Sequence, residues 1–367
     1  MRKFIDQFSR FFVGCLFIFS GLIKLNDPIG TEIKMEEYFE VFSEDFGSLF
    51  LFFKSYALEI GMIMIVLEVV LGVAVLLNYR MKITTIVLLV LMIFFTFLTF
   101  YSAVFNKVTD CGCFGDAIKL TPWQSFYKDV ILMFFVVHLF WYRRSYEPAL
   151  RSREGHAAII AVAIISTFLG IYAVRHLPFI DFRAYKIGNN IPKQMQPQEQ
   201  PDIVFVFEKK GKEIESKKFL AETDGYKYKD SKVLNADKSV AKITDYAVTD
   251  VSGNDITQNT FEGAKLLFIL YNVHAASTNN IDRIKKLVRD LNGKVDMLAL
   301  TASSEDEFET FRHENQLALP YAFADATVLK TIIRSNPGIT LWVNGTVKGM
   351  WHHNDTPAAE EVLEKIK

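Results

Sequence analysis

The sequence predicts an α-helical membrane bundle followed by an extracytoplasmic α/β domain. Half of the 367 residues are hydrophobic and 33 are Phe, a heavy apolar content for a soluble protein. Uncharged runs fill the chain up to about residue 175, whereas residues 181–262 are rich in Lys, Glu, Asp, Gln and Pro. This contrast places the first domain boundary after the last apolar run. The formal net charge of −1 gives no indication of nucleic-acid binding.

Five segments are long and apolar enough, or nearly so, to cross the hydrocarbon core of a bilayer, which takes about 20 residues. They are residues 8–25, 56–78, 83–105, 124–142 and 156–174. Backbone polar groups cannot remain unpaired in lipid, so these segments are predicted to be helices.

The positions of the basic residues predict the orientation of these spans. Clusters of Arg and Lys precede the first span and follow the second and fourth: Arg2, Lys3, Arg10, Arg80, Lys82, Arg143, Arg144, Arg151 and Arg153. Such clusters favour the cytoplasmic side, whereas the acidic loop at 26–55 fits the opposite side. We therefore expect a multi-pass protein of the plasma (inner) membrane with a cytoplasmic N-terminus and a periplasmic C-terminal domain.

The loop after the third span carries two of the three cysteines, Cys111 and Cys113, in the run Asp-Cys-Gly-Cys-Phe-Gly-Asp. Gly112 permits the tight turn that a bridge between these two residues requires, and Gly115 offers a second turn. A small ring of this kind is strained, and strained disulfides are the labile, oxidising ones. Three interpretations remain open: a redox-active pair, a structural disulfide, or a metal site or inert thiols. Metal binding is disfavoured because no further Cys or His lies nearby.

Ionisable groups within the spans are the next candidates. Glu68 lies near the middle of the second span, where an ionisable group is costly and needs a partner or a cavity. Two interpretations remain open: a neutral carboxyl bonded to a neighbouring helix, or a proton-handling group beside a redox pair. Lys24 and Glu59 lie near the outer ends of their spans and are expected to pair with each other.

The first 145 residues resemble a known family of membrane proteins. The run Phe19–Lys24 followed by Asn26–Gly30 resembles the start of DoxX-like proteins, and Glu68 with Cys111-Gly112-Cys113-Phe114-Gly115 resembles their MauE branch, named for methylamine utilisation. The resemblance implies a four-helix bundle, distantly like that of vitamin K epoxide reductase, with thiol or disulfide chemistry outside the membrane. The segment 156–174 would then be a fifth transmembrane helix.

The second half of the chain reads as a linker and an α/β domain. Four prolines and several glutamines mark residues 175–201 as the linker, and residues 202–367 as the extracytoplasmic domain. From residue 265 strands and helices alternate, and an Asn-Gly turn at 344–345 predicts a hairpin before a terminal helix. The order of these elements from about residue 240 resembles that of thioredoxins. The position of the thioredoxin cysteines reads His-Ala-Ala-Ser at 274–277, and Pro337 is offset from the family's cis-proline, so a trans bond is expected there.

These features favour a membrane-bound thiol–disulfide oxidoreductase with catalytic residues Cys111, Cys113 and Glu68. A quinone is an electron partner by analogy alone, and no metal is expected. The cysteine-free thioredoxin-like domain would present a protein partner outside the membrane. The alternative is a non-catalytic assembly or scaffold protein with a static disulfide. A transporter is a third option, although no broken-helix pair stands out.

Overall fold

The computed structural model describes residues 2–108, 112–209, 211–220 and 225–367. The chain divides into two compact units, residues 1–183 and residues 184–367. The described part of the first unit contains helices and no strand, and the second unit contains two β-sheets. An apolar helical unit followed by an α/β unit confirms the predicted fold class.

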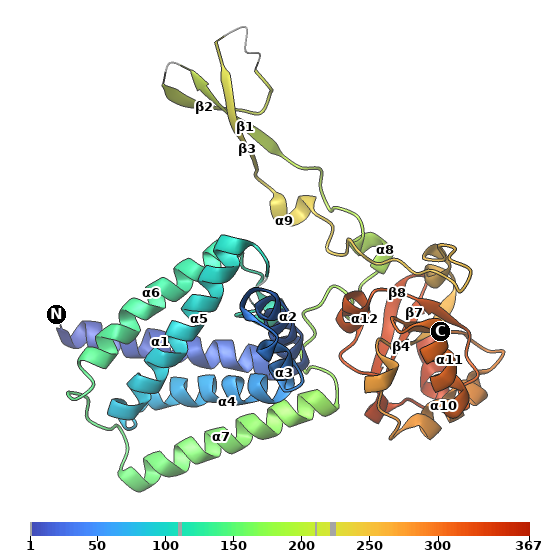
Figure 1. Ribbon diagram of the computed structural model, residues 1–367, viewed down its shortest axis with the longest axis horizontal. Coiled ribbons are helices and arrows are strands. Elements are labelled where there is room, and N and C mark those ends of the chain that lie inside the picture. The colour runs from blue at the N-terminus through green and yellow to red at the C-terminus, as the bar shows by residue number, and fades with distance from the viewer. Residues whose placement is uncertain (1, 109–111, 210, 221–224) are drawn as a thin grey trace. The chain divides into compact units, whose positions relative to one another are not determined.

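The first unit is built from long helices that run back and forth beside one another (Figure 1). The helices are α1 (Arg2–Asn26), α2 (Pro28–Phe46), α3 (Leu49–Lys54), α4 (Ala57–Leu76), α5 (Met81–Phe105), α6 (Pro122–Trp141) and α7 (Ser152–Arg175). Four of them, α1, α4, α5 and α7, are long and apolar enough to cross a membrane. The fourth predicted span forms α6, which has 20 residues. It lies outside this set because Lys128, Asp129 and His138 lower its mean hydropathy.

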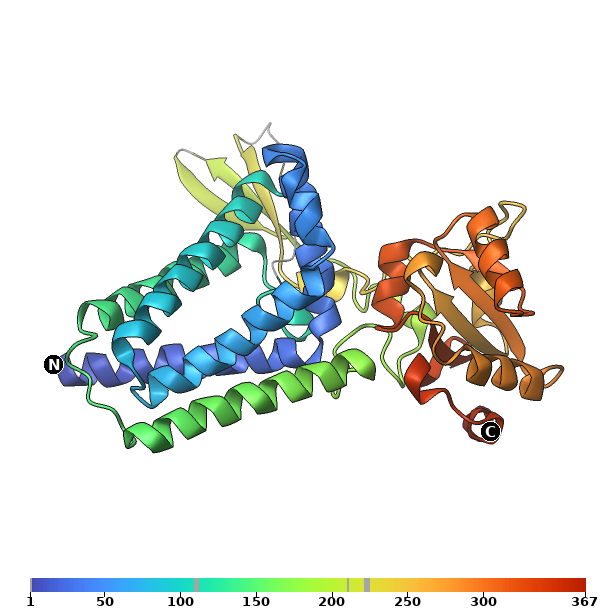
Figure 2. The same cartoon turned by 60° about the horizontal axis from the view of Figure 1, so that its bottom comes forward.

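The pairs α1–α4 and α5–α6 are the closest helix pairs of the bundle, and α7 lies along α4 and α1 (Figure 2). The acidic stretch expected as a loop at 26–55 forms α2 and α3. Asp27 starts α2 by accepting a hydrogen bond from the Gly30 amide, and Pro28 occupies its first turn.

The end of α1, the start of α4, the end of α5 and the start of α6 all lie at the same end of the bundle as Cys113. We call this the cysteine end.

The contact of α1 with α4 depends on glycine. A Cβ atom on Gly72 would lie 2.8 Å from the carbonyl oxygen of Gly14, and a backbone atom cannot move aside as a side chain does. We expect Gly72→Ala to lower the free energy of unfolding by about 1–3 kcal/mol, because the two helices must separate. Gly61→Ala in the same helix is the control, since its Cβ would meet only Thr31 at 3.5 Å. Thermal unfolding in detergent measures both, and equal midpoints would contradict the prediction.

The second unit contains a small sheet and a larger one. The small sheet has the order β2-β1-β3, and its strands are β1 (Ile203–Lys209), β2 (Lys212–Ser216) and β3 (Lys227–Val233). The larger sheet has the order β6-β5-β4-β7-β8, and its strands are β4 (Ala264–Leu270), β5 (Asp296–Thr301), β6 (Tyr321–Phe323), β7 (Gly338–Val343) and β8 (Thr346–His352). The longer helices of this unit are α10 (Ile281–Leu291), α11 (Glu305–Glu314), α12 (Ala326–Ile332) and α13 (Ala359–Ile366). Two short helices, α8 (Ile191–Gln194) and α9 (Ala236–Ser239), precede this sheet.

The larger sheet has the arrangement that its alternating pattern predicts. The strand β4 is parallel to β5 and antiparallel to β7, so the β4–α10–β5 crossover places α10 on one face. Leu266, Phe268, Ile339 and Leu341 are fully buried in a core shared with α10, α11 and α13. The alternation of strands and helices predicted from residue 265 onward is present, as are the hairpin of β7 and β8 and the terminal helix α13.

Both edges of this sheet are paired with other parts of the chain. Gly188 donates to the Val347 carbonyl at 2.9 Å, so the segment after residue 184 covers β8. Thr249 and Phe323 exchange two hydrogen bonds of 2.9 and 2.8 Å, which covers β6. Part of the stretch expected to be a linker therefore completes the domain, and the paired edges protect the sheet from association with other strands.

Candidate functional site

A cavity of about 90 Å³ lies inside the helical bundle at its cysteine end. A single buried water requires roughly 10–15 Å³, so this space can hold several waters or a small polar group. Helices α1, α2, α4, α5 and α6 line it together with the cysteine loop. The polar side chains of the lining are Ser20, Lys24, Thr31, Lys34, Tyr38, Glu68, Thr99, Cys113, Lys128 and Asp129.

The centre of this lining is a buried ion pair. The Lys24 ammonium donates to Glu68 Oε1 at 2.6 Å, and the side chains are only 11% and 3% exposed. Ser20, one turn before Lys24, donates to Glu68 Oε2 at 3.0 Å. The expected pairing of Lys24 with Glu59 is wrong: Glu59 is exposed, whereas the buried Glu68 carboxylate needs a counter-charge, and the long Lys24 side chain supplies it.

Ser20 also connects the ion pair to the cysteine loop. Its hydroxyl also lies 2.9 Å from the Cys113 carbonyl oxygen, so its single proton is shared between the Glu68 carboxylate and the loop. The Cys113 side chain is partly exposed and lines the cavity. The structure thus brings two of the three predicted catalytic residues, Glu68 and Cys113, to one site. The third, Cys111, lies outside the described residues.

Glycines shape the described part of the loop as the sequence predicts. Gly112 and Gly115 have φ values of +64° and +49°, in the left-handed region that favours glycine. The Gly115 amide donates to the Gly112 carbonyl at 3.1 Å and closes a turn around Cys113. A Cβ on Gly112 would lie 3.2 Å from Lys34 Cγ, so α2 packs directly over the loop.

A second ion pair faces the same cavity and was not predicted. Lys128 donates to Asp129 Oδ1 at 2.9 Å, and Thr99 donates to the other carboxylate oxygen at 3.0 Å. Asp129 is 2% exposed, and the Lys128 ammonium lies 5.2 Å from the centre of the Phe114 ring, beside Cys113. Adjacent charges near the start of an apolar span are the signal that could have revealed this pair.

A separate group of ionisable side chains lies at the opposite end of the bundle from this cavity. His138 Nε2 is 2.8 Å from Asp6 Oδ1, and Tyr146 donates to the same carboxylate at 3.2 Å. Arg10 donates to the Leu76 carbonyl at 2.8 Å, which ties α1 to the end of α4. Cys15 lies within α1 and is partly exposed. The contacts of His138, Tyr146 and Arg10 join helices at that end of the bundle.

In the α/β unit, residues 274–277, which were expected to occupy the position of the thioredoxin cysteines, take part in polar contacts. His274 Nε2 lies 3.0 Å from Glu307 Oε1, and this hydrogen bond lowers the pKa of the exposed Glu307 carboxyl. The Ser277 amide donates to the Asn336 carbonyl at 2.9 Å. The Asn336–Pro337 bond is cis, so the expected trans bond is wrong. The chain has cysteine only at positions 15, 111 and 113, so this unit cannot itself carry out dithiol chemistry.

Comparison with known proteins supports the resemblance of the first half. Residues 2–142 match the family model described as "Methylamine utilisation protein MauE". A curated relative, "Protein TlpB" of Flavobacterium psychrophilum, is 30% identical over 143 residues. That match covers 38% of this chain and 37% of the relative. The predicted likeness of the helical unit to the MauE family is thereby confirmed, and the chain is a multi-pass membrane protein.

No solved structure matches the chain. The expected likeness of the second unit to thioredoxins therefore stays a prediction from the order of its strands and helices. The matched segment includes the residues that line the cavity, from Leu16 to Leu132. The α/β unit lies wholly outside it.

Proposed function

We propose that this protein is a membrane-bound thiol–disulfide oxidoreductase in which Cys111 and Cys113 exchange an electron pair with a protein partner. The observation that carries the proposal is the placement of Cys113 on a cavity that contains the buried Lys24–Glu68 pair. An ionisable pair held inside an apolar bundle is costly and is typical of functional sites. The match to the MauE family supports the same assignment.

The reaction is a dithiol–disulfide exchange. Oxidation of the two thiols to one disulfide releases two electrons and two protons, which pass to the disulfide of the partner and convert it to two thiols. The attacking group is a thiolate, and nearby ammonium groups favour its formation. Three lysines, Lys24, Lys34 and Lys128, line the cavity with Cys113. In this proposal the Glu68 carboxylate accepts a thiol proton, and Ser20 holds the loop beside it.

A quinone is the alternative electron partner. Apolar and aromatic side chains of the cavity, among them Phe17, Met92 and Phe95, are of the kind that contact a quinone ring. When bound, a quinone would accept the electron pair and two protons. The residues of the lining match a quinone in their chemistry, and Lys24 would donate to a ring oxygen only in place of its bond to Glu68.

The proposed orientation places the cysteine end of the bundle and the α/β unit on the periplasmic side. Its support is the gathering of basic residues at the opposite end of the bundle, where Arg10 contacts the last turn of α4 and Arg80 precedes α5. Disulfide chemistry is suppressed in a reducing cytosol and persists outside it. The α/β unit, which has no cysteine, then serves to hold a protein partner.

The redox midpoint of the cysteine pair tests this function. Alkylation of the detergent-solubilised protein against a glutathione series should give a midpoint in the range of catalytic dithiols, about −120 to −270 mV. Cys15→Ser should leave the midpoint unchanged, whereas Cys113→Ser should abolish the titration. A pair that stays oxidised below about −300 mV, or never oxidises, would favour the scaffold function with a static disulfide or inert thiols.

A further inference from the structure

The short helix α3 is the most exposed apolar element of the bundle. Its sequence is Leu-Phe-Leu-Phe-Phe-Lys, and none of its six residues is buried. Leu49 is 70% exposed and Phe52 is 61% exposed, and Phe46 at the end of α2 is 58% exposed. Each apolar side chain left in water costs free energy in proportion to its area, and soluble surfaces seldom carry a contiguous patch of this kind.

This patch continues onto a helix of membrane length. The ring centre of Phe42 lies 5.4 Å from that of Phe50 in α3 and 6.4 Å from that of Phe97 in α5. Phe97 and the neighbouring Phe105 are themselves exposed along α5, which is long and apolar enough to cross a bilayer. Phe42 itself is buried, and its ring joins the aromatic side chains of α3 to the face that α5 presents to lipid.

The opposite face of α2 is acidic. Met35, Tyr38 and Phe42 point into the bundle, whereas Glu36, Glu40 and Glu44 recur every four residues on the other side of the helix. Glu40 also pairs with Lys54 at the end of α3. The hairpin of α2 and α3 thus has an apolar edge and a charged edge, the pattern of segments that lie in the plane of a membrane interface.

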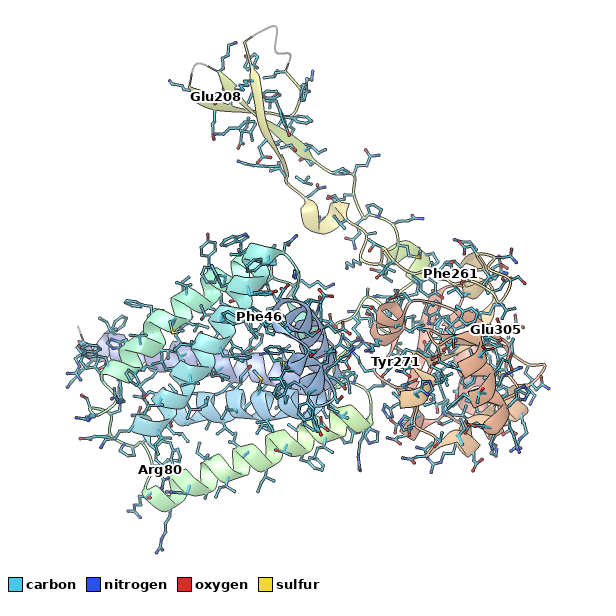
Figure 3. All side chains as sticks on the ribbon, viewed as in Figure 1. Phe46, Arg80, Glu208, Phe261, Tyr271 and Glu305 are labelled. Carbon is cyan, nitrogen blue, oxygen red and sulfur yellow. The ribbon has the colours of Figure 1, made fainter. Side chains whose placement is uncertain are left out.

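Exposed aromatic residues with polar atoms occur at this end of the bundle. Tyr56 precedes α4, and Trp123 and Tyr127 occupy the first turns of α6; all three are exposed. Trp and Tyr are enriched where a membrane protein crosses the boundary between headgroups and acyl chains. Figure 3 shows Phe46 far from Arg80, which lies at the other end of the bundle.

We propose that α3 and the adjoining end of α2 are inserted in the lipid interface at the cysteine end, with Phe46, Leu49 and Phe52 in contact with acyl chains. The acidic stripe of α2 then faces water. Helix α2 also lines the cavity, through Thr31, Lys34, Met35 and Tyr38. Insertion of the hairpin therefore keeps this wall of the cavity at the membrane surface. The inference rests on the assignment of the chain as a membrane protein and is independent of its redox chemistry.

Spin labels placed at positions 52 and 44 test the insertion in lipid vesicles. Each label is attached to the full chain through Phe52→Cys or Glu44→Cys, in a background with Cys15, Cys111 and Cys113 replaced by Ser. We expect the ratio of collisions with oxygen to collisions with a water-soluble nickel chelate to be several times higher at position 52. A ratio at 52 equal to that at 44 would place α3 in water and overturn the proposal. Low collision rates with both reagents would show protein cover, such as a second copy of the chain, and would also overturn it.

A second measurement on the unsubstituted protein guards against misfolding of the variants. Vesicles containing a phospholipid with a photoreactive group on its acyl chain are irradiated, and the modified peptides are identified by mass spectrometry. We expect adducts on residues 49–54 as well as on the spans at 57–76 and 81–105. Adducts confined to the spans would contradict the insertion of α3.

Discussion

Replacing Lys24 by methionine is expected to lower the free energy of unfolding of the helical bundle by about 3–5 kcal/mol. The substitution leaves the Glu68 carboxylate, whose side chain is 3% exposed, without the ammonium group that lies 2.6 Å from it. An unpaired charge inside an apolar bundle loses its hydration and gains nothing in exchange. Unfolding of the detergent-solubilised protein with increasing denaturant measures the change.

Two further variants distinguish the effect of losing the ion pair from a loss of stability that any substitution at this site could cause. Lys24→Met combined with Glu68→Leu removes both charges, and the stability should return to near that of the original chain, since well-packed apolar groups can replace a buried pair. Lys34→Met breaks a pair with Glu37 whose side chains are about one-third exposed, and should cost at most about 1 kcal/mol. Equal effects of Lys24→Met and Lys34→Met would mean that the buried pair does not stabilise the bundle.

The same double variant distinguishes a structural role from a functional one. If the pair serves only the fold, the cysteines of the double variant exchange disulfides with glutathione at the same midpoint and rate as those of the original chain. If Glu68 accepts a thiol proton, the double variant is stable but exchanges disulfides more slowly, with an altered pH profile. General acid–base groups typically contribute about 10²–10⁴-fold to a rate, so the loss is measurable.

The positions of the long helices could be predicted from the sequence because lipid imposes one constraint on every span. A backbone without water must bond within its own helix, so an apolar run of sufficient length becomes a helix whatever its neighbours are. The partner of Lys24 could not be predicted in this way. Glu59 and Glu68 both lie in α4, and only the packing of α1 against α4 decides which of them is buried.

The missed strands have a similar explanation. The strand β3 is exposed along its whole length and carries the sequence Lys-Tyr-Lys-Asp-Ser-Lys-Val, with no alternation of apolar residues. Pairing with β1 and ion pairs such as Lys232–Glu215 hold it in the small sheet. The strand β6 has three residues and is defined by its partners β5 and Thr249. Local sequence pattern carries little information where tertiary pairing decides the structure.

The segment 184–195 shows how composition can mislead about a boundary. Its proline and polar residues indicate a linker, yet Ile191 is fully buried, and its amide donates to the Gly345 carbonyl at 2.8 Å. Tyr185 is also buried, and its ring stacks on that of Trp342 at 6.4 Å between centres. Trp342 in turn contacts Tyr246 and Phe261, the second of which is labelled in Figure 3. An aromatic core thus joins this segment to β7.

Tyr185→Ala is therefore expected to destabilise the α/β unit by about 3–5 kcal/mol, as the loss of a core aromatic residue does. The ring removed is buried against Trp342, and the cavity left behind adds to the loss of buried apolar area. Replacing Trp123 and Trp141 by Phe leaves Trp342 and Trp351 as the fluorescent probes of this unit. Their emission during denaturant unfolding measures the effect within the full chain.

Tyr185→Phe is the matched control and has a different expected sign. Among the described residues no hydrogen-bond partner reaches the buried Tyr185 hydroxyl, and burial raises the pKa of this phenol, so the group gains nothing from its position. Removing an unbonded buried hydroxyl while keeping the ring should leave stability unchanged or raise it slightly. A loss with Tyr185→Phe comparable to that of Tyr185→Ala would reveal a polar partner for the hydroxyl. A change within about 0.5 kcal/mol for Tyr185→Ala, typical of surface substitutions, would mean that this segment is a linker and does not stabilise the domain.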